Sequence, residues 1–575
     1  MPSRADSKKA VALLAEGLAR YRDGDALRAA KLLRSVIQLE PANPTALALL
    51  GAMAMQNGDL ARAASLLERA ARFATPNAAL FTNLGEAYRR LGRREEAVAA
   101  FRRAIAEAPT LAEAHYNLGL TLDQLGQRPE AIASLERALS LNPGLPQGVT
   151  LLLEMLRDQA EYYRAIAAYH KFGPLLPASA SLEAAVANVL ADVFRLDEAL
   201  AHFRRALELE PSSANLHADY ATALVERGEV PDAIRYLRSA LELDPHHVLA
   251  HGSLVYLLAF DESADAPTIG AEARRFGVQQ TTSLTRASTH PNTKEPERRL
   301  RVAYISPDFR LHPSALFTPP LLREHDRSAV EVFCYSNARR TDAITAQIRA
   351  LADEWRDIST LTDDAVASLV QADRIDVLVD LSMHCAHNRL LVFARKPAPV
   401  QVCWLAYPGT TGLSAMDYRI TDPRLDPDGR DEPHYSEQSC RLPETFWCYA
   451  PLAAEPAVNA LPAAKNGHVT FGSLNSFKKV SRAAVDQWAR VLVAVPGSRM
   501  VLVAPDGQAR ERVLEGFRKG GVQPERIELM SYVQRDPYLE MYHKIDCCLD
   551  TLPYCGGTTS LDAFWMGVPV VTLAG

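Results

Sequence analysis

The sequence predicts an α-helical repeat solenoid followed by an α/β region built of two doubly wound halves. Three observations carry this prediction. An alanine recurs every 34 residues through the first 250 residues, and apolar runs alternate with helical stretches from Leu300 onward. A polar, proline-rich break from Pro451 to Gly467 divides that second region. A single long period is the signature of stacked repeats, and βα alternation is typical of parallel sheets.

The repeated unit has the pattern of two amphipathic helices. The recurring alanines are Ala29, Ala63, Ala97, Ala131, Ala165, Ala199 and Ala233, and the recurring prolines are Pro41, Pro76, Pro109, Pro143, Pro177, Pro211 and Pro245. A small alanine lets two helices approach closely, and a proline ends the second helix. The period resembles that of the tetratricopeptide repeat, so we expect about seven repeats over residues 8–258, forming a superhelix with a concave groove.

The rest of the chain divides into four predicted segments. We expect a linker over residues 259–298, a first Rossmann-like half over 299–450, a connector over 451–466 and a second Rossmann-like half over 467–575. Strand-like runs such as RVAYIS and DVLVDLS mark the first half, and HVTFGSL and RMVLVAP mark the second. Doubly wound sheets bind ligands beyond the carboxyl ends of their strands, so we expect the chemistry in the loops there.

Composition sets limits on function. The 575-residue chain has a formal net charge of -6, which gives no general attraction to nucleic acid or to an anionic membrane. We find no signal peptide, no uninterrupted apolar run of about 18 residues, and no metal-type spacing among the cysteines. We therefore expect a cytoplasmic protein with reduced cysteines, no metal site, and no nucleic-acid or membrane partner.

Five loops that follow predicted strands carry polar or small residues. They hold His312; His384; the run Tyr407, Pro408, Gly409, Thr410 and Thr411; the run Asn475 to Lys479; and the run Gly556, Gly557, Thr558 and Thr559. Glycines at a helix N-terminus suit a phosphate, and a lysine adds a positive charge. Each of these loops also has a structural interpretation: a capping box from Thr559 to Asp562, a plain turn at Tyr407, structural histidines and a solvated lysine.

Five motifs together resemble the protein O-GlcNAc transferase family, and within it the SPINDLY branch. They are SPDFRLHPSAL, PAPVQVCWLAYPGTTG, MDYRITD, VTFGSLNSFKKVS and LDTLPYCGGTTSLDAFWMGVPVVTLAG. The resemblance covers nearly the whole chain and implies tetratricopeptide repeats joined to a glycosyltransferase domain of the GT-B fold. Relatives continue beyond the point that matches VPVVTLAG, so we expect the second half to be truncated.

The resemblance also implies roles for single residues. His312 is the first candidate for the general base and His384 the second, while Lys479 stabilises the leaving diphosphate. The neighbouring Lys478 stands where O-GlcNAc transferases usually have tyrosine. Donor-binding roles are implied for Asn475, Arg535, Tyr538, Gly556, Gly557, Thr558, Thr559 and Asp562, with Tyr538 stacking on the base. We expect the loop 407–411 to line the acceptor side of the cleft.

The function implied is inverting transfer of a sugar to serine or threonine of a protein that the repeats select. UDP-GlcNAc is the favoured donor, and the SPINDLY likeness makes GDP-fucose the alternative. The donor is a co-substrate, and the family needs no metal. Two other functions stay open: a tetratricopeptide adaptor with an inactive transferase domain, and a transferase acting on a glycan or lipid-linked sugar. Self-association through the repeats is also open.

Overall fold

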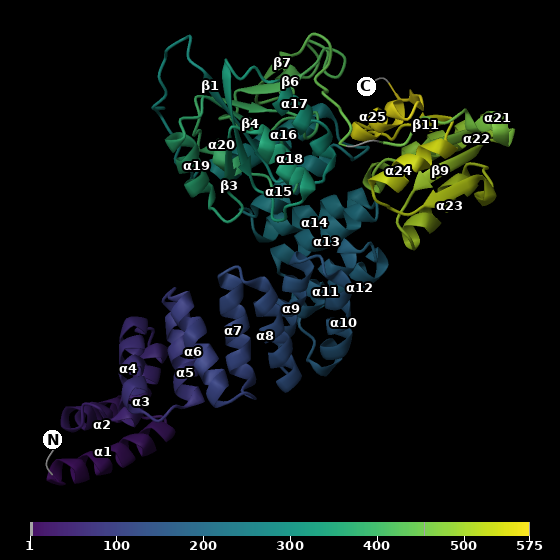
Figure 1. Cartoon of the computed structure of the whole chain (residues 1–575). Coiled ribbons are helices and arrows are strands. Elements are labelled where there is room, and N and C mark those ends of the chain that lie inside the picture. Colours follow the sequence, from purple (N-terminus) through teal and green to yellow (C-terminus); the bar gives the residue numbers. More distant parts are fainter. Residues whose placement is uncertain (1–3, 453–454, 574–575) are drawn as a thin grey trace. The chain divides into compact units, whose positions relative to one another are not determined.

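The computed structural model describes residues 4–452 and 455–573 and divides the chain into two compact units, Met1–Val193 and Phe194–Gly575. Figure 1 shows helices alone in the first unit, and helices followed by two sheets in the second. The predicted fold class, a helical repeat array followed by an α/β region, is confirmed. The unit boundary falls inside the predicted repeats, between α11 and α12.

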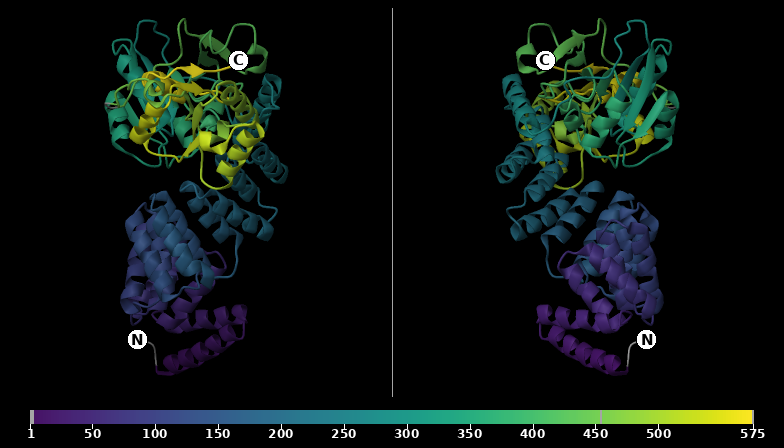
Figure 2. Two further views of the ribbon diagram at one scale, coloured as in Figure 1. Left: turned by 90° about the vertical axis from the view of Figure 1, so that its right-hand side faces the viewer. Right: turned by 90° about the vertical axis from the view of Figure 1, so that its left-hand side faces the viewer.

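The first unit consists of helix pairs, of which Figure 2 shows the first in purple. Its helices are α1 (Arg4–Arg22), α2 (Ala26–Leu39), α3 (Pro44–Gln56), α4 (Leu60–Phe73), α5 (Ala78–Arg90), α6 (Arg94–Glu107), α7 (Ala112–Gln124), α8 (Arg128–Leu141), α9 (Pro146–Asp158), α10 (Tyr162–Phe172) and α11 (Ala180–Asp192), with a 3-10 turn η1 (Gly173–Leu175). The recurring alanines of this unit are fully buried. A side chain at Gly85 would overlap Phe101 of the partner helix, which explains the small residue at this crossing.

The second unit begins with five more helices. They are α12 (Leu196–Leu209), α13 (Ala214–Glu226), α14 (Val230–Leu243), α15 (Val248–Leu258) and α16 (Ala266–Thr281). The last of them lies within the segment expected as a linker. Val255 of α15 and Phe276 of α16 share one buried cluster with Ile305 of the first sheet. The end of the helical array is therefore part of the core of the first α/β half.

The first α/β half contains a seven-stranded parallel sheet in the order β3-β2-β1-β4-β5-β6-β7. The strands are β1 (Leu300–Ser306), β2 (Val330–Ser336), β3 (Glu354–Asp357), β4 (Val377–Asp380), β5 (Val400–Cys403), β6 (Tyr418–Thr421) and β7 (Gln438–Arg441); the helical elements are η2 (Pro313–Leu316), α17 (Thr318–Glu324), α18 (Ala343–Leu351), α19 (Asp363–Ala372), α20 (Leu390–Ala394) and η3 (Glu432–His434). Val302 of β1 lies opposite Val332 of β2 and Val377 of β4. The strand order reverses direction between β1 and β4, which brings the loops holding His312 and His384 to one switch point.

The second half has a five-stranded parallel sheet in the order β10-β9-β8-β11-β12. The strands are β8 (Thr470–Ser473), β9 (Arg499–Val503), β10 (Ile527–Met530), β11 (Cys547–Leu549) and β12 (Val570–Val571); the helical elements are α21 (Pro462–Asn466), η4 (Phe477–Lys479), α22 (Arg482–Ala494), α23 (Gln508–Lys519), η5 (Pro524–Arg526), α24 (Arg535–Met541), η6 (Tyr542–Lys544) and α25 (Thr558–Trp565). Its switch point lies between β8 and β11. The loops that leave these two strands are the Asn475–Lys479 loop and the loop that contains Gly556 and Gly557.

No helix within residues 4–452 and 455–573 combines the length and the apolar composition needed to cross a bilayer. In the same described ranges, the structure gathers no group of three or more histidine, cysteine, aspartate or glutamate side chains that would suit a metal ion.

Candidate functional site

Two loops of the second half are joined at its switch point. The Thr559 hydroxyl donates a 2.6 Å hydrogen bond to Oδ1 of Asn475. Asp550, at the end of β11, accepts from both loops: from Nδ2 of Asn475 at 3.3 Å and from the backbone N–H of Gly556 at 2.7 Å. Asn475 and Asp550 are buried, so these polar bonds fix the relative position of the loops.

The two glycines occupy crowded positions. A Cβ atom on Gly556 would lie 2.8 Å from Oγ1 of Thr559 and 3.1 Å from Oδ1 of Asn475. A Cβ atom on Gly557 would lie 3.2 Å from the ring of Trp447, which comes from the first half. Glycine is therefore required by close packing at the start of α25, whatever ligand the loop accepts.

The capping-box interpretation of Thr559 and Asp562 is wrong. Helix α25 begins at Thr558, its N-cap is Gly557, and no side chain caps it. Thr559 already lies inside the helix, and its hydroxyl is used by Asn475 across the switch point. The first N–H groups of α25 thus have no side-chain cap, which leaves this helix end as a donor-rich, partly positive position.

Lys479 is held against the loop that precedes α25. Its Nζ donates to the backbone oxygen of Cys555 at 3.0 Å and lies 4.5 Å from the centroid of the Tyr554 ring. Burial lowers the pKa of Lys479 to about 8, while the negative charge of Asp550 opposes this shift. The ammonium group is therefore mainly protonated at pH 7 and lies beside the uncapped helix end.

Asp562, Arg535 and Tyr538, the other predicted donor-binding side chains, bind one another. Asp562 accepts from Tyr449 at 2.7 Å, from Arg535 at 3.0 Å and from Tyr538 at 3.1 Å, and it is 2% exposed. Arg535 also pairs with Glu455 at 2.6 Å. The Tyr538 hydroxyl further bonds to that of Tyr542 at 2.8 Å, and its ring packs on the core of the second half. This arrangement orders the end of α25; stacking of Tyr538 on a base stays a prediction.

His312 lies on the first half, in the loop between β1 and η2. Its Nδ1 is 2.8 Å from the hydroxyl of Ser314 and 3.5 Å from a carboxylate oxygen of Asp308. Burial lowers the pKa of His312, Asp308 raises it, and the charges of Arg310 and Lys478 lower it further. A neutral imidazole at pH 7, oriented by a neighbouring carboxylate, has the properties of a general base.

His384 lies in the interior, which argues against the role of second candidate base. It is 3% exposed, its Nε2 is bonded to the backbone oxygen of Thr411 at 2.9 Å, and its ring packs edge-on to Phe276. Burial lowers its pKa to about 3. A base must reach a substrate hydroxyl, whereas this ring orients the Thr411 loop from within.

The loop predicted to line the acceptor side is largely buried as well. Thr410 and Thr411 both bond to the carboxylate of Glu437, and Tyr407 packs in the core of the first half. Pro408 is exposed and Gly409 partly exposed. Only the tip of this loop is therefore accessible to an acceptor in the structure.

Sequence reasoning missed several aromatic side chains at the junction of the two halves. Phe260, just after α15, stacks on Tyr554 with ring centroids 4.5 Å apart and planes 5° apart. Tyr256 of α15 lies 5.1 Å from Tyr407. The ring of Trp447 lies where a Cβ atom on Gly557, just before α25, would approach it to 3.2 Å. The run FWCYA is a signal that could have been noticed, since three aromatic residues within four positions are unusual. Tyr256 falls in the predicted last repeat and Phe260 at the start of the predicted linker, and neither position suggests a site.

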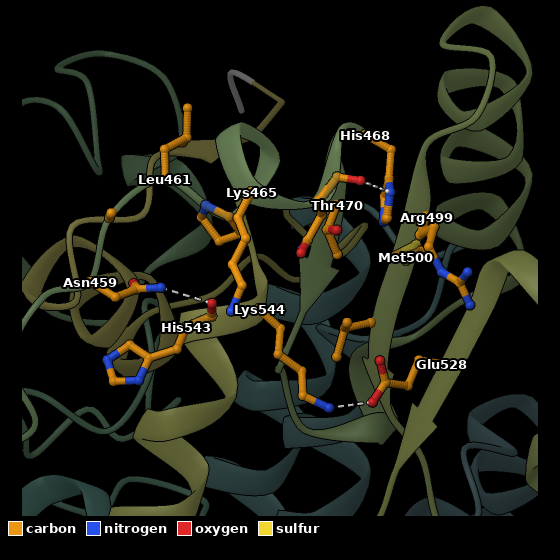
Figure 3. A pocket seen from close by; sticks show the side chains of 14 residues that line it. Asn459, Leu461, Lys465, His468, Thr470, Arg499, Met500, Glu528, His543 and Lys544 are labelled. Carbon is orange, nitrogen blue, oxygen red and sulfur yellow. Dashed lines mark hydrogen bonds and ion pairs between the residues drawn. The ribbon is translucent and has the colours of Figure 1, made fainter.

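A separate pocket of about 520 Å³ lies at the amino ends of two strands of the second sheet, β8 and β9 (Figure 3). Thr470 and Arg499, which begin β8 and β9, line it together with Lys465, and Lys544 pairs with Glu528 at 2.5 Å. Since Lys479 and Thr559 follow the carboxyl ends of the strands, this pocket is distinct from the predicted donor site.

Comparison with known proteins agrees with the motifs. A model of glycosyl transferase family 41 matches residues 242–450 and 459–575, and tetratricopeptide-repeat models match residues 14–79, 82–146 and 190–255. The probable UDP-N-acetylglucosamine–peptide N-acetylglucosaminyltransferase SPINDLY of Petunia hybrida is 39% identical over 292 residues, which are 49% of this chain and 31% of that protein. The probable SEC enzyme of Arabidopsis thaliana is 30% identical over 317 residues, 52% of this chain and 31% of that protein. The chain spans about a third of the length of these curated relatives.

A solved structure is similar over more of the chain. It is a lysine-to-methionine mutant of the O-GlcNAc transferase of Thermobaculum terrenum, 34% identical, with a TM-score of 0.68 over 81% of this chain and 83% of that one. The family model covers more than half of the present chain. The chain therefore belongs to glycosyl transferase family 41, with tetratricopeptide repeats preceding the family's α/β region.

Proposed function

We propose that this protein is an inverting protein O-glycosyltransferase that moves a sugar from a nucleoside diphosphate to a serine or threonine hydroxyl. One observation carries the proposal. The hydrogen bond from Thr559 to Asn475 joins the first turn of α25 to the loop that ends in Lys479, at the switch point of the second half. Membership of family 41 and the likeness to a bacterial O-GlcNAc transferase support it.

In this mechanism the second half stabilises the leaving group. As the bond between the anomeric carbon and the diphosphate oxygen breaks, negative charge develops on the diphosphate. Lys479 and the N-terminal N–H groups of α25 supply fixed positive charge and donors for it, which is worth roughly 2.7–4 kcal/mol per donor in comparable sites. The negative charge of the diphosphate would also favour the protonated form of Lys479.

The first half activates the acceptor. The acceptor oxygen forms the new bond to the anomeric carbon from the face opposite the leaving diphosphate, so the configuration inverts. In the tautomer with the hydrogen on Nδ1, Nε2 of His312 takes the proton of the hydroxyl, and Asp308, 3.5 Å from Nδ1, stabilises the imidazolium that results. His384 has an indirect role: its hydrogen bond to the Thr411 backbone oxygen holds that loop in position.

We propose UDP-GlcNAc as the donor and GDP-fucose as the alternative. The names of the relatives favour the first, since those proteins are described as N-acetylglucosaminyltransferases. The small Gly557 against Trp447, where the resemblance associates glycine with SPINDLY, favours the second. Protein acceptors selected by the repeats complete the proposal, and no metal takes part in it.

Thermal unfolding with UDP, UDP-GlcNAc, GDP and GDP-fucose tests the proposal, followed by donor turnover with the preferred nucleotide sugar. Ligand at about a hundred times its dissociation constant stabilises the folded state by about 2.7 kcal/mol. We expect one nucleotide pair to raise Tm, and Lys479→Ala to reduce the shift and abolish turnover. Nucleotide binding without turnover would favour the adaptor, and no shift with any ligand would contradict the donor site.

A further inference from the structure

Lys478 and Lys479 are adjacent in the chain but contact different aromatic rings. Nζ of Lys479 lies over Tyr554, whereas Nζ of Lys478 lies 5.5 Å from the centroid of Tyr256 and 5.9 Å from that of Phe260. Phe260 and Tyr554 are themselves stacked. The two ammonium groups of this loop therefore have different surroundings. Lys479 lies next to the loop before α25, and Lys478 lies next to the end of α15.

Lys478 is a partly buried cation with no ion-pair partner among residues 4–452 and 455–573. The carboxylate of Asp308, on the first half, is already used, since it lies 3.2 Å from Arg310 and 3.5 Å from His312. Aromatic faces stabilise an ammonium group only in part, by about 0.5–2 kcal/mol. A cation in such surroundings attracts a mobile anion.

Lys478 is linked by geometry to the loop predicted to line the acceptor side. Its Nζ lies 5.5 Å from the centroid of Tyr256, and the Tyr256 ring lies 5.1 Å from that of Tyr407, which begins this loop. The positive charge of Lys478 also lowers the pKa of His312, the proposed general base, which must touch the acceptor hydroxyl. The donor diphosphate has its own cation in Lys479, next to α25.

We propose that Lys478 forms an anion subsite that takes a carboxylate side chain of the acceptor polypeptide, next to the serine or threonine that receives the sugar. The inference rests on the proposed function and adds the substrate class: acceptor segments with aspartate or glutamate beside the hydroxyl. Tyr256 and Phe260 position the ammonium group for this contact.

Matched peptides test the subsite. We would use Ser-centred peptides with either aspartate or asparagine at the flanking positions, with the nucleotide sugar that turns over. The wild-type chain should prefer the acidic peptide by about three- to tenfold in kcat/KM, more strongly at low salt. Lys478→Met should remove the preference, Lys478→Arg should keep it, and Lys478→Glu should reverse it towards lysine-flanked peptides.

Lys465→Met is the matched control, because Lys465 lines the separate pocket of Figure 3 and its loss should leave the preference unchanged. Equal use of both peptides by the wild-type chain, or a preference that survives in Lys478→Met, would overturn the subsite. Failure of the proposed function is a different result, namely no donor turnover with any acceptor.

A binding measurement decides the matter even without turnover. Fluorescein-labelled versions of the two peptides would be titrated with the full chain in the presence of UDP or GDP, and anisotropy would be followed. Tighter binding of the aspartate peptide to wild type and to Lys465→Met, but not to Lys478→Met, supports the subsite. Identical binding in all three proteins contradicts it.

The pH dependence of kcat/KM distinguishes a lysine whose charge acts at the site from one with only a structural role. His312 is faced by Asp308, Arg310 and Ser314 from its own half and by the charge of Lys478 from the second. Removing a positive charge favours the imidazolium, so Lys478→Met should shift the acid limb of kcat/KM to higher pH, whereas Lys478→Arg should leave it in place. An unchanged limb in Lys478→Met would show that this charge does not act at the acceptor side.

Discussion

The hydroxyl of Thr559 lies 2.6 Å from the side-chain oxygen of Asn475, and this bond joins the first turn of α25 to the loop that follows β8. It replaces the local cap that the spacing of Thr559 and Asp562 suggests. The start of α25 and the Asn475–Lys479 loop are consequently linked, so we expect a change at Thr559 to affect Lys479.

Thr559→Val should weaken both the fold and nucleotide binding. It keeps the shape of threonine but removes the donor, so the buried oxygen of Asn475 loses a partner, which costs about 1–3 kcal/mol. Urea unfolding would measure the stability, and calorimetry with UDP or GDP the affinity. Thr559→Ser, which keeps the hydroxyl, should stay close to wild type; equal losses in both variants would show that the methyl group matters instead.

Nucleotide affinity should fall above pH 8 through Lys479. Its pKa is lowered to about 8 by burial, so the ammonium charge is lost as the pH rises through that value. The dissociation constant of the preferred diphosphate should then increase by up to about tenfold per pH unit. Lys479→Met, with no proton to lose, should bind weakly with a flat profile between pH 7 and pH 9.5.

The same pKa predicts an effect on stability of the opposite sign. The ordinary pKa of a lysine is 10.5, so between about pH 8 and pH 10.5 the unfolded chain binds a proton that the folded chain does not. The cost of burying the charge is therefore complete below pH 8 and fades above it. Unliganded Lys479→Met should have a higher Tm than wild type at pH 7, and the difference should vanish by pH 10.5.

The contact of Gly557 with Trp447 should limit what this position accepts. A Cβ atom there would approach the tryptophan ring to 3.2 Å, so Gly557→Ala should push the start of α25 away from the first half. We expect a reduced Tm shift with nucleotide, restored in part when Trp447→Phe is added. A double-mutant cycle with no coupling between the two positions would contradict the contact.

The two histidines should separate by phenotype. His312→Ala should lower kcat by about 10²–10⁴ with little effect on unfolding, because a base contributes that much and the side chain is partly exposed. His384→Ala should instead reduce stability, since it leaves a cavity and an unpaired Thr411 carbonyl. If kcat per folded molecule fell by a similar factor in both variants, His384 would again be a candidate for the general base.

Acid should expose the structural role of His384. Its folded pKa of about 3 is below the ordinary 6.5, so the unfolded chain binds the extra proton between these values. The stability associated with the neutral buried ring is complete above pH 6.5 and is lost as the pH falls towards 3. His384→Gln should therefore flatten the loss of Tm between pH 6.5 and pH 4.

Local patterns in the sequence were enough for the architecture. The 34-residue recurrence, the βα alternation and the break after Pro451 depend on neighbours along the chain, and the helices and strands follow them. The placement of His312 and Lys479 after strands also follows, because strands of a parallel sheet direct their carboxyl ends to one edge. The expected linker, however, contributes α16 to a buried core, which composition alone does not reveal.

The sequence by itself determined which residues end the strands, and with them the loops in which the chemistry is expected. Only the tertiary structure decided what each side chain does there. Thr559 bonds to Asn475 across the switch point instead of capping a helix. Asp562 accepts hydrogen bonds from Arg535, Tyr449 and Tyr538, and Phe260 stacks on Tyr554. The physical reason is that secondary structure follows short-range periodicity, whereas hydrogen-bond partners and burial depend on segments far apart in the chain that meet only when the halves pack.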